Sequence, residues 1–244
     1  TVNKPVIDIK IFTQKNFLIG AVICCVFAIN IYPPIFLMPI LVTKIHHIDP
    51  IDIGFIISAM GLGMMIAGPI AGQFIKIYGA KPLIILGSLI TGLGTYMQSY
   101  ITAEFIFLDL LPSQLLKGIG TQLLFMGSQY ICFSSLKESK IPNASAMYNL
   151  TMRLTAAISI SVSSNYLIKF KRQFFLKISD YNNTETLTLS ALENDKTNSQ
   201  FLGSLFQLYE RESFIMAFNK ISYICFWTSA IPLFLLLALY IKNK

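Results

Sequence analysis

Six long apolar segments restrict the possible folds of this chain more than any other feature of its sequence. They cover residues 17–42, 53–75, 82–101, 106–135, 144–168 and 214–241. Because about 20 largely apolar residues suffice to cross a bilayer as a helix, each segment is predicted to span the membrane. The expected fold is therefore an all-α membrane protein whose six transmembrane helices form one bundle over residues 16–244.

The composition supports a lipid environment. Hydrophobic residues make up 54% of the chain and charged residues 13%, and the mean hydropathy is +0.62. Since soluble domains carry about 25% charged residues, too few polar groups are present to cover a water-exposed surface. This excludes a soluble cytosolic domain, a disordered chain and a nucleic-acid-binding module, so the expected partner is the lipid bilayer and not nucleic acid.

Lysines in the loops predict the orientation, because basic residues gather in cytoplasmic loops. Six crossings place both termini on one side, and that side carries nine lysines against one in the two short loops opposite. The nine are Lys4, Lys10, Lys15, Lys76, Lys81, Lys137, Lys140, Lys242 and Lys244, and the one is Lys44. Both termini are therefore expected to be cytoplasmic.

Two segments lie outside the expected spans. Residues 1–15 are interpreted as a cytoplasmic segment leading into the first span, and because the chain begins with Thr1 it is expected to be a fragment or a processed product. Residues 169–213 are predicted to be an outer connection, although they hold six basic residues. Within that connection, 187–210 is either a weak amphipathic helix near the outer mouth or a plain solvated loop.

Polar residues gather on one face of the fourth span, where the bilayer makes them costly. At 100° per residue they fall within an arc of about 140°. The arc contains Gln114, Lys117, Thr121, Gln122, Ser128 and Gln129, together with Phe125. This face either lines a wet substrate pathway or packs against other helices through hydrogen bonds.

The fifth span carries a second polar face, on which Ser145, Asn149 and Arg153 recur every four residues. Arg153 is predicted either to face a cavity or an anion, or to lock the helix end structurally. Asp109, near the outer end of the fourth span, is a candidate proton or cation site or an acid in the headgroup region.

Other reactive residues suggest no catalytic or metal chemistry. The pair His46-His47 lies in an outer loop without nearby Cys or paired acids, which favours a surface role over a metal site. Cys24, Cys25, Cys132 and Cys225 stand in apolar stretches and are interpreted as small hydrophobic residues. No cofactor, metal site or enzyme activity is expected.

The loop after the second span resembles the signature loop of the major facilitator superfamily, G-x-x-x-D-x-x-G-[RK]-[RK]. Gly72, Gly79 and Lys81 match, whereas Lys76 stands in place of the family acid. Such loss of the acid is commoner in the C-terminal half of the family's chains. The resemblance implies a conformational role for this loop. A charge relay through the loop would need the family acid, which Lys76 replaces here.

A closer resemblance runs from Gln114 to Arg153. Gln114 and Gly118, the run 131–136 and the pattern N-A-S-x-M-x-N-x-x-x-R over 143–153 are similar to EmrB-type drug:proton antiporters, a branch with 14 spans. Residues 5–17 resemble that branch's link into its C-terminal half. The resemblance implies the C-terminal bundle of a transporter in the bacterial inner membrane. It also implies small-molecule cargo and protons, a missing N-terminal half and a periplasmic adaptor protein as partners.

Three functions follow as hypotheses. The first is proton-coupled efflux of drugs or other amphipathic toxic compounds, by rocking of two bundles about a midplane site. The second is the same fold carrying another cargo, such as a siderophore or metabolite anion, which Arg153 and Lys117 would attract. The third is a six-span membrane enzyme or a non-transporting scaffold. A rhomboid-type protease would need an intramembrane Ser with a His, and both His residues of this chain lie in one outer loop.

Overall fold

The computed structural model describes residues 9–46, 50–102, 107–182 and 195–242, and the secondary structure in these ranges is entirely helical. A short 3-10 helix, η1 (Ile9–Thr13), precedes the long helices, and a second, η2 (Glu138–Lys140), joins two of them. The long helices are α1 (Lys15–His46), α2 (Pro50–Tyr78), α3 (Ala80–Gln98), α4 (Phe107–Ser134), α5 (Ile141–Asn182), α7 (Asp195–Ser229) and α8 (Ile231–Lys242). The chain is thus an all-α membrane protein.

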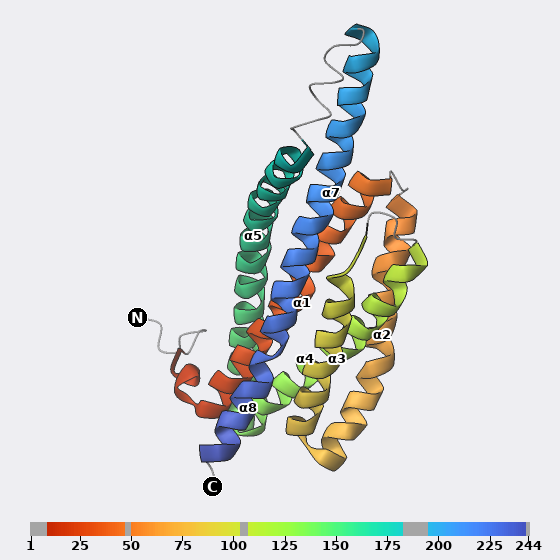
Figure 1. The fold of residues 1–244 in the computed structure, drawn as a ribbon. Helices are drawn as coiled ribbons and strands as arrows, with labels where there is room; N and C mark the ends of the chain where they lie inside the picture. Colours follow the sequence, from red (N-terminus) through yellow and green to blue (C-terminus); the bar gives the residue numbers. More distant parts are fainter. Residues whose placement is uncertain (1–8, 47–49, 103–106, 183–194, 243–244) are drawn as a thin grey trace.

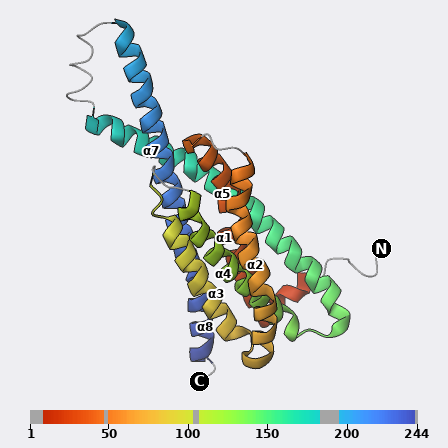
Figure 2. The same cartoon turned by 90° about the vertical axis from the view of Figure 1, so that its right-hand side faces the viewer.

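Seen as in Figure 1, the helices run up and down, and the chain ends described here both lie toward the bottom. η1, the α2–α3 turn, η2 and the end of α8 lie at the bottom in that view, and the start of α7 lies at the top. α4 contacts α1, α2 and α3, whereas α1 also contacts α5 and α7. The α5–α7 pair projects beyond the other helices at the upper end (Figure 2).

Almost every described residue of the six predicted spans is helical, although α5 and α7 extend well beyond the fifth and sixth spans. The sixth is interrupted at Ala230, because Pro232 lacks the N–H that a continuous helix would need. By length and hydropathy, the described residues contain four candidate spans, Lys15–Thr43, Ile53–Tyr78, Ala80–Gln98 and Phe206–Leu236. α4 and α5 are not among them, and they are the helices that carry the two polar faces noted in the sequence.

Residues 169–213, predicted as an outer connection, are helical over most of the part that the structure describes, and their location outside the membrane stays a prediction. α5 continues to Asn182 and α7 begins at Asp195, so most of this segment extends the two helices. Residues 195–210 belong to α7 and form neither a separate amphipathic helix nor a loop, and 187–194 lie outside the described residues. The extensions are joined by contacts that no local sequence pattern predicts: Lys171 pairs with Glu210 at 2.6 Å, and the Phe175 and Phe206 rings lie 5.3 Å apart.

Glycines bring the helices close to α4. A Cβ at Gly118 would collide with the backbone oxygen of Met60 on α2, and one at Gly120 with the backbone nitrogen of Thr91 on α3. Only glycine therefore permits these two crossings, as small residues do at helix interfaces within membranes.

Of the predicted cytoplasmic segment 1–15, the structure describes only residues 9–15, which form η1 and the start of α1.

Candidate functional site

The polar face of α4 divides into a buried part and a half-buried part. Gln114, Lys117, Thr121 and Ser128 are buried inside the bundle, while Gln122, Phe125 and Gln129 are half-buried. Thr121 donates to the carbonyl of Lys117 at 2.7 Å, within its own helix. The buried residues therefore pack against other parts of the bundle, which is the second of the two interpretations given for this face. The contribution of all seven to a substrate cavity stays a prediction.

Lys117 is fully buried between α3 and α4, where its ammonium donates a hydrogen bond to Oε1 of Gln98 at 2.7 Å. Gln98 is the last residue of α3, so the ammonium lies near the partially negative end of that helix, where a cation is favoured. The long side chain reaches this position as membrane lysines do when they extend toward a helix end. The lysine thus joins two helices of the same bundle.

Ser128 and Phe125 join α4 to α5 and α1. The hydroxyls of Ser128 and Tyr148 are hydrogen-bonded at 2.6 Å, and both residues are buried. The Phe125 ring lies 5.0 Å from that of Phe27 and 6.2 Å from that of Tyr148. Tyr148 was not among the predicted site residues, although it lies inside the N-A-S-x-M-x-N pattern directly before Asn149.

Asn149 and Arg153 are exposed on α5, on the face predicted from their spacing. The amide of Asn149 donates to the carbonyl of Ser145 at 2.9 Å. Among the residues that the structure describes, none accepts a hydrogen bond from the Arg153 guanidinium or pairs with it. Arg153 lies 12 residues into α5, about 18 Å along the helix, and no described residue of this bundle neutralises its charge there.

A group of methionines and aromatic residues lies between α1, α2, α4 and α5. Phe27 and Met60 are buried in it, and Tyr32, Met64, Phe125 and Met152 are half-buried against them. A pattern of polar residues does not predict this group; the available signals were that Met60 and Met64 are one turn apart and that Met152 precedes Arg153. Hereafter the half-buried residues Tyr32, Met64, Phe125 and Met152 are called the Met–aromatic cluster.

Asp109 lies at the other end of the bundle from η2. It lines a cavity of about 220 Å³ with Met97, Tyr100, Thr102 and Ser113, among others, where α3 and α4 connect. Arg153, which lies toward the η2 end, is therefore not brought together with Asp109. The function of Asp109 as a proton or cation site stays a prediction.

The predicted loop motif forms the turn between α2 and α3. Gly79 is the only residue between the two helices, and its φ of +80° favours glycine over any residue with a side chain. Lys76 and Lys81 are exposed, and a Cβ at Gly72 would meet open space. A cavity of about 410 Å³ joins Gly79 and Lys81 to the ends of α1, α4 and α8.

The described residues contain no group of three or more His, Cys, Asp or Glu side chains that could hold a metal ion. Cys24, Cys132 and Cys225 are buried free thiols, and Cys25 is a half-buried one. The predicted pair His46-His47 is untested, because His47 and the His46 side chain lie outside the described part.

The sequence profile of the Major Facilitator Superfamily matches residues 18–171, which is more than half of the chain. The chain belongs to the major facilitator superfamily. It is therefore a multi-pass membrane protein of a transporter family, and its helices form a bundle of the major facilitator fold.

Relatives within this superfamily match at low identity. The colistin resistance protein EmrB of Acinetobacter baumannii is 22% identical over 67% of this chain and 32% of its own length. The multidrug export protein EmrB of Haemophilus influenzae is 26% identical over 94% and 46%, and that of Escherichia coli is 24% identical over 94% and 45%. The chain spans less than half the length of each of these relatives.

Proposed function

We propose that this chain is the C-terminal bundle of a secondary transporter that exports drugs or other amphipathic toxic compounds in exchange for protons. The observation that carries the proposal is the position of Arg153 and Asn149, exposed on α5 beside the Met–aromatic cluster. Methionine and aromatic side chains adapt to apolar groups of varied shape. A guanidinium and an amide bind polar groups, so together this surface suits amphipathic molecules.

Alternating access between two bundles is the mechanism that the fold favours, with the cargo held near the membrane midplane. This bundle supplies one wall, which includes Asn149, Arg153, Phe125 and the half-buried Gln122 and Gln129. The second wall comes from an N-terminal bundle, a proposal supported by the greater length of the relatives. By resemblance, the protein lies in the bacterial inner membrane with cytoplasmic termini and works with a periplasmic adaptor protein.

A second candidate cargo is an anion, such as a siderophore or another acidic metabolite. Arg153 favours it, because a guanidinium without a described partner binds carboxylates strongly through two parallel hydrogen bonds. The proposed amphipathic cargo and this anionic cargo differ in the apolar surface that they require. Replacement of Met64 and Met152 by Ala therefore lowers transport in the first case far more than in the second.

Transport by the protein encoded by the complete gene, reconstituted in proteoliposomes, tests the proposal. An imposed pH gradient is expected to drive movement of a fluorescent amphipathic dye, and a protonophore is expected to abolish it. Residues 1–244 alone are expected to insert without transporting, because one bundle supplies only one wall. Gradient-driven dye movement by this fragment would contradict the half-transporter proposal, and anion movement without dye movement would favour the second cargo.

A further inference from the structure

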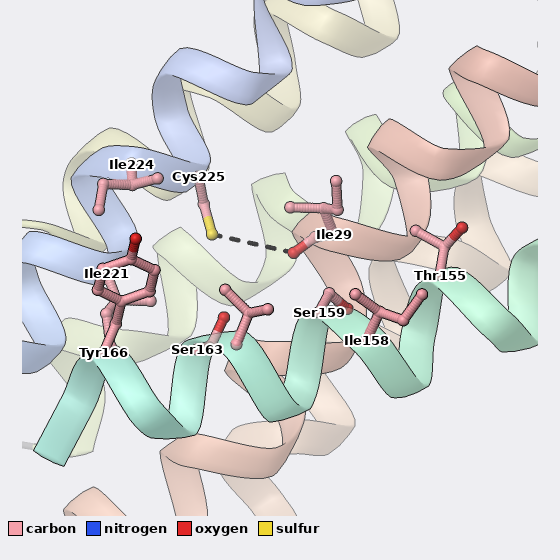
Figure 3. Close-up of a pocket in the computed structure, with 10 residues that line it drawn as sticks. Ile29, Thr155, Ile158, Ser159, Ser163, Tyr166, Ile221, Ile224 and Cys225 are labelled. Carbon is pink, nitrogen blue, oxygen red and sulfur yellow. Dashed lines mark hydrogen bonds between the residues drawn. The ribbon is translucent and has the colours of Figure 1, made fainter.

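An open groove lies between α1, α5 and α7, away from the Met–aromatic cluster. It has a volume of about 420 Å³, and Figure 3 shows α5 and α7 side chains facing each other across it, with Ile29 of α1 between them. Apolar side chains of α5 and α7 dominate its lining, among them Ile158, Val162, Ile221 and Ile224.

The polar atoms of the groove are largely satisfied within the bundle. Ser159 donates to the carbonyl of Ala156 at 2.9 Å, and Thr155 donates to the sulfur of Cys25 at 3.3 Å. Cys225 contacts the carbonyl of Ile29 at 3.9 Å, as the dashed line in Figure 3 marks. None of the described residues that line the groove is charged, so an apolar chain fits it better than a polar ligand.

The length of the groove matches one leaflet of a bilayer. From Thr155 to Tyr166 along α5 is 11 residues, about 16 Å, or half of the ~30 Å hydrocarbon core. Ile158 and Val162 are exposed there, and on α7 the groove falls within the candidate span Phe206–Leu236. Tyr166 ends the groove, and tyrosine is the residue type that gathers where hydrocarbon meets headgroups.

Two lysines continue the groove beyond Tyr166, toward the projecting end of α5 and α7. Lys169 is exposed and lies within about 20° of Val162 around the helix. Lys220 is exposed on α7, directly before Ile221, and its ammonium lies 4.3 Å from the centre of the Phe170 ring on α5. Lys171 differs, because its charge is paired with Glu210 at 2.6 Å.

We propose that this groove is a binding site for an anionic phospholipid of the surrounding bilayer. One acyl chain lies against Ile158, Val162 and Ile224, and the headgroup phosphate lies between Lys169 and Lys220. The charge complementarity of the lysines to phosphate and the leaflet-long apolar groove below them identify the same ligand. The site does not depend on the nature of the transported cargo.

The test is binding of dioleoyl phosphatidylglycerol and dioleoyl phosphatidylethanolamine to the delipidated full-length protein, measured by native mass spectrometry. Lys169→Gln with Lys220→Gln is expected to weaken phosphatidylglycerol binding about tenfold or more, since each lysine near the phosphate contributes about fivefold. Phosphatidylethanolamine binding is expected to fall less, because the ammonium of that lipid offsets the charge of its phosphate. Lys169→Gln alone, which removes no described contact, is expected to give about half of the effect on phosphatidylglycerol binding on a logarithmic scale.

Two matched controls separate the site from general effects. Lys137→Gln with Lys140→Gln removes the same charge from exposed positions around η2, at the other end of the bundle, and is expected to leave binding unchanged. Ser163→Phe fills the groove and is expected to reduce binding of both lipids, whereas Ser161→Phe, on an exposed face outside the groove, is not. Equal losses from the two lysine pairs, or undiminished binding with Ser163→Phe, would overturn the proposal.

Discussion

Arg153 is an exposed guanidinium that no described residue of its own bundle neutralises. Its charge is costly in the membrane unless water, cargo or another bundle meets it. In the full-length protein, Arg153→Ala is therefore expected to lower the transport rate about tenfold or more, as the loss of a charged hydrogen bond does. Arg153→Lys is expected to restore it only in part, because an ammonium cannot form the planar two-point contact.

The comparison variant for Arg153 is Arg172→Ala, which removes an exposed arginine of the same helix beyond the predicted span. It is expected to transport at the rate of the unmodified protein. Dye efflux and the amount of folded protein are measured together for all three variants. A loss of folded protein in Arg153→Ala, with normal transport by the remainder, would show that Arg153 is a structural lock.

Lys117 has the opposite environment, because its ammonium is fully buried and donates to Gln98. Lys117→Met leaves the side-chain amide oxygen of Gln98 without its donor, which is expected to lower the free energy of unfolding by about 1–3 kcal/mol. The double replacement Lys117→Met with Gln98→Leu removes both partners and is expected to recover most of this loss. Thermal unfolding of the purified protein measures both, and a double variant less stable than the single one would contradict the pairing.

The packing of α2 against α4 depends on Gly118. An added Cβ would lie 2.9 Å from the carbonyl carbon of Met60 and closer still to its oxygen, so Gly118→Ala forces the two helices apart. This is expected to cost about 1–3 kcal/mol of stability, as overpacking of a core does. Gly61→Ala on α2 is the matched control: no atom lies within 4 Å of its Cβ position, so no loss is expected. Equal unfolding temperatures for the two variants would contradict this packing.

Periodicity and length were enough to predict the helices of the bundle, because apolar runs of span length leave few alternatives in a bilayer. The same reasoning missed the helical extensions of α5 and α7. Their contacts join Lys171 to Glu210 and Phe175 to Phe206, pairs that are far apart in the sequence. It also predicted a polar face on α4 without distinguishing Lys117, which bonds to Gln98, from Gln122, which stays half-buried. Whether a polar residue of α4 is buried or half-buried depends on where α3 packs, and no local sequence pattern encodes this position.

The arrangement of the whole bundle adds a geometric reason to the orientation predicted from the lysines. η2 lies at the same end as the α2–α3 turn, and the end of α5 and the start of α7 lie at the opposite end (Figure 1). In intact cells, a membrane-impermeant maleimide is therefore expected to label Gln173→Cys, which is exposed on α5 beyond the predicted span 144–168, and to miss Ser139→Cys in η2. Both variants are made with the four native cysteines replaced, and both are labelled after the cells are opened. Labelling of Ser139→Cys alone would invert the orientation, and labelling of both in intact cells would show that the two ends do not lie on opposite sides of the membrane.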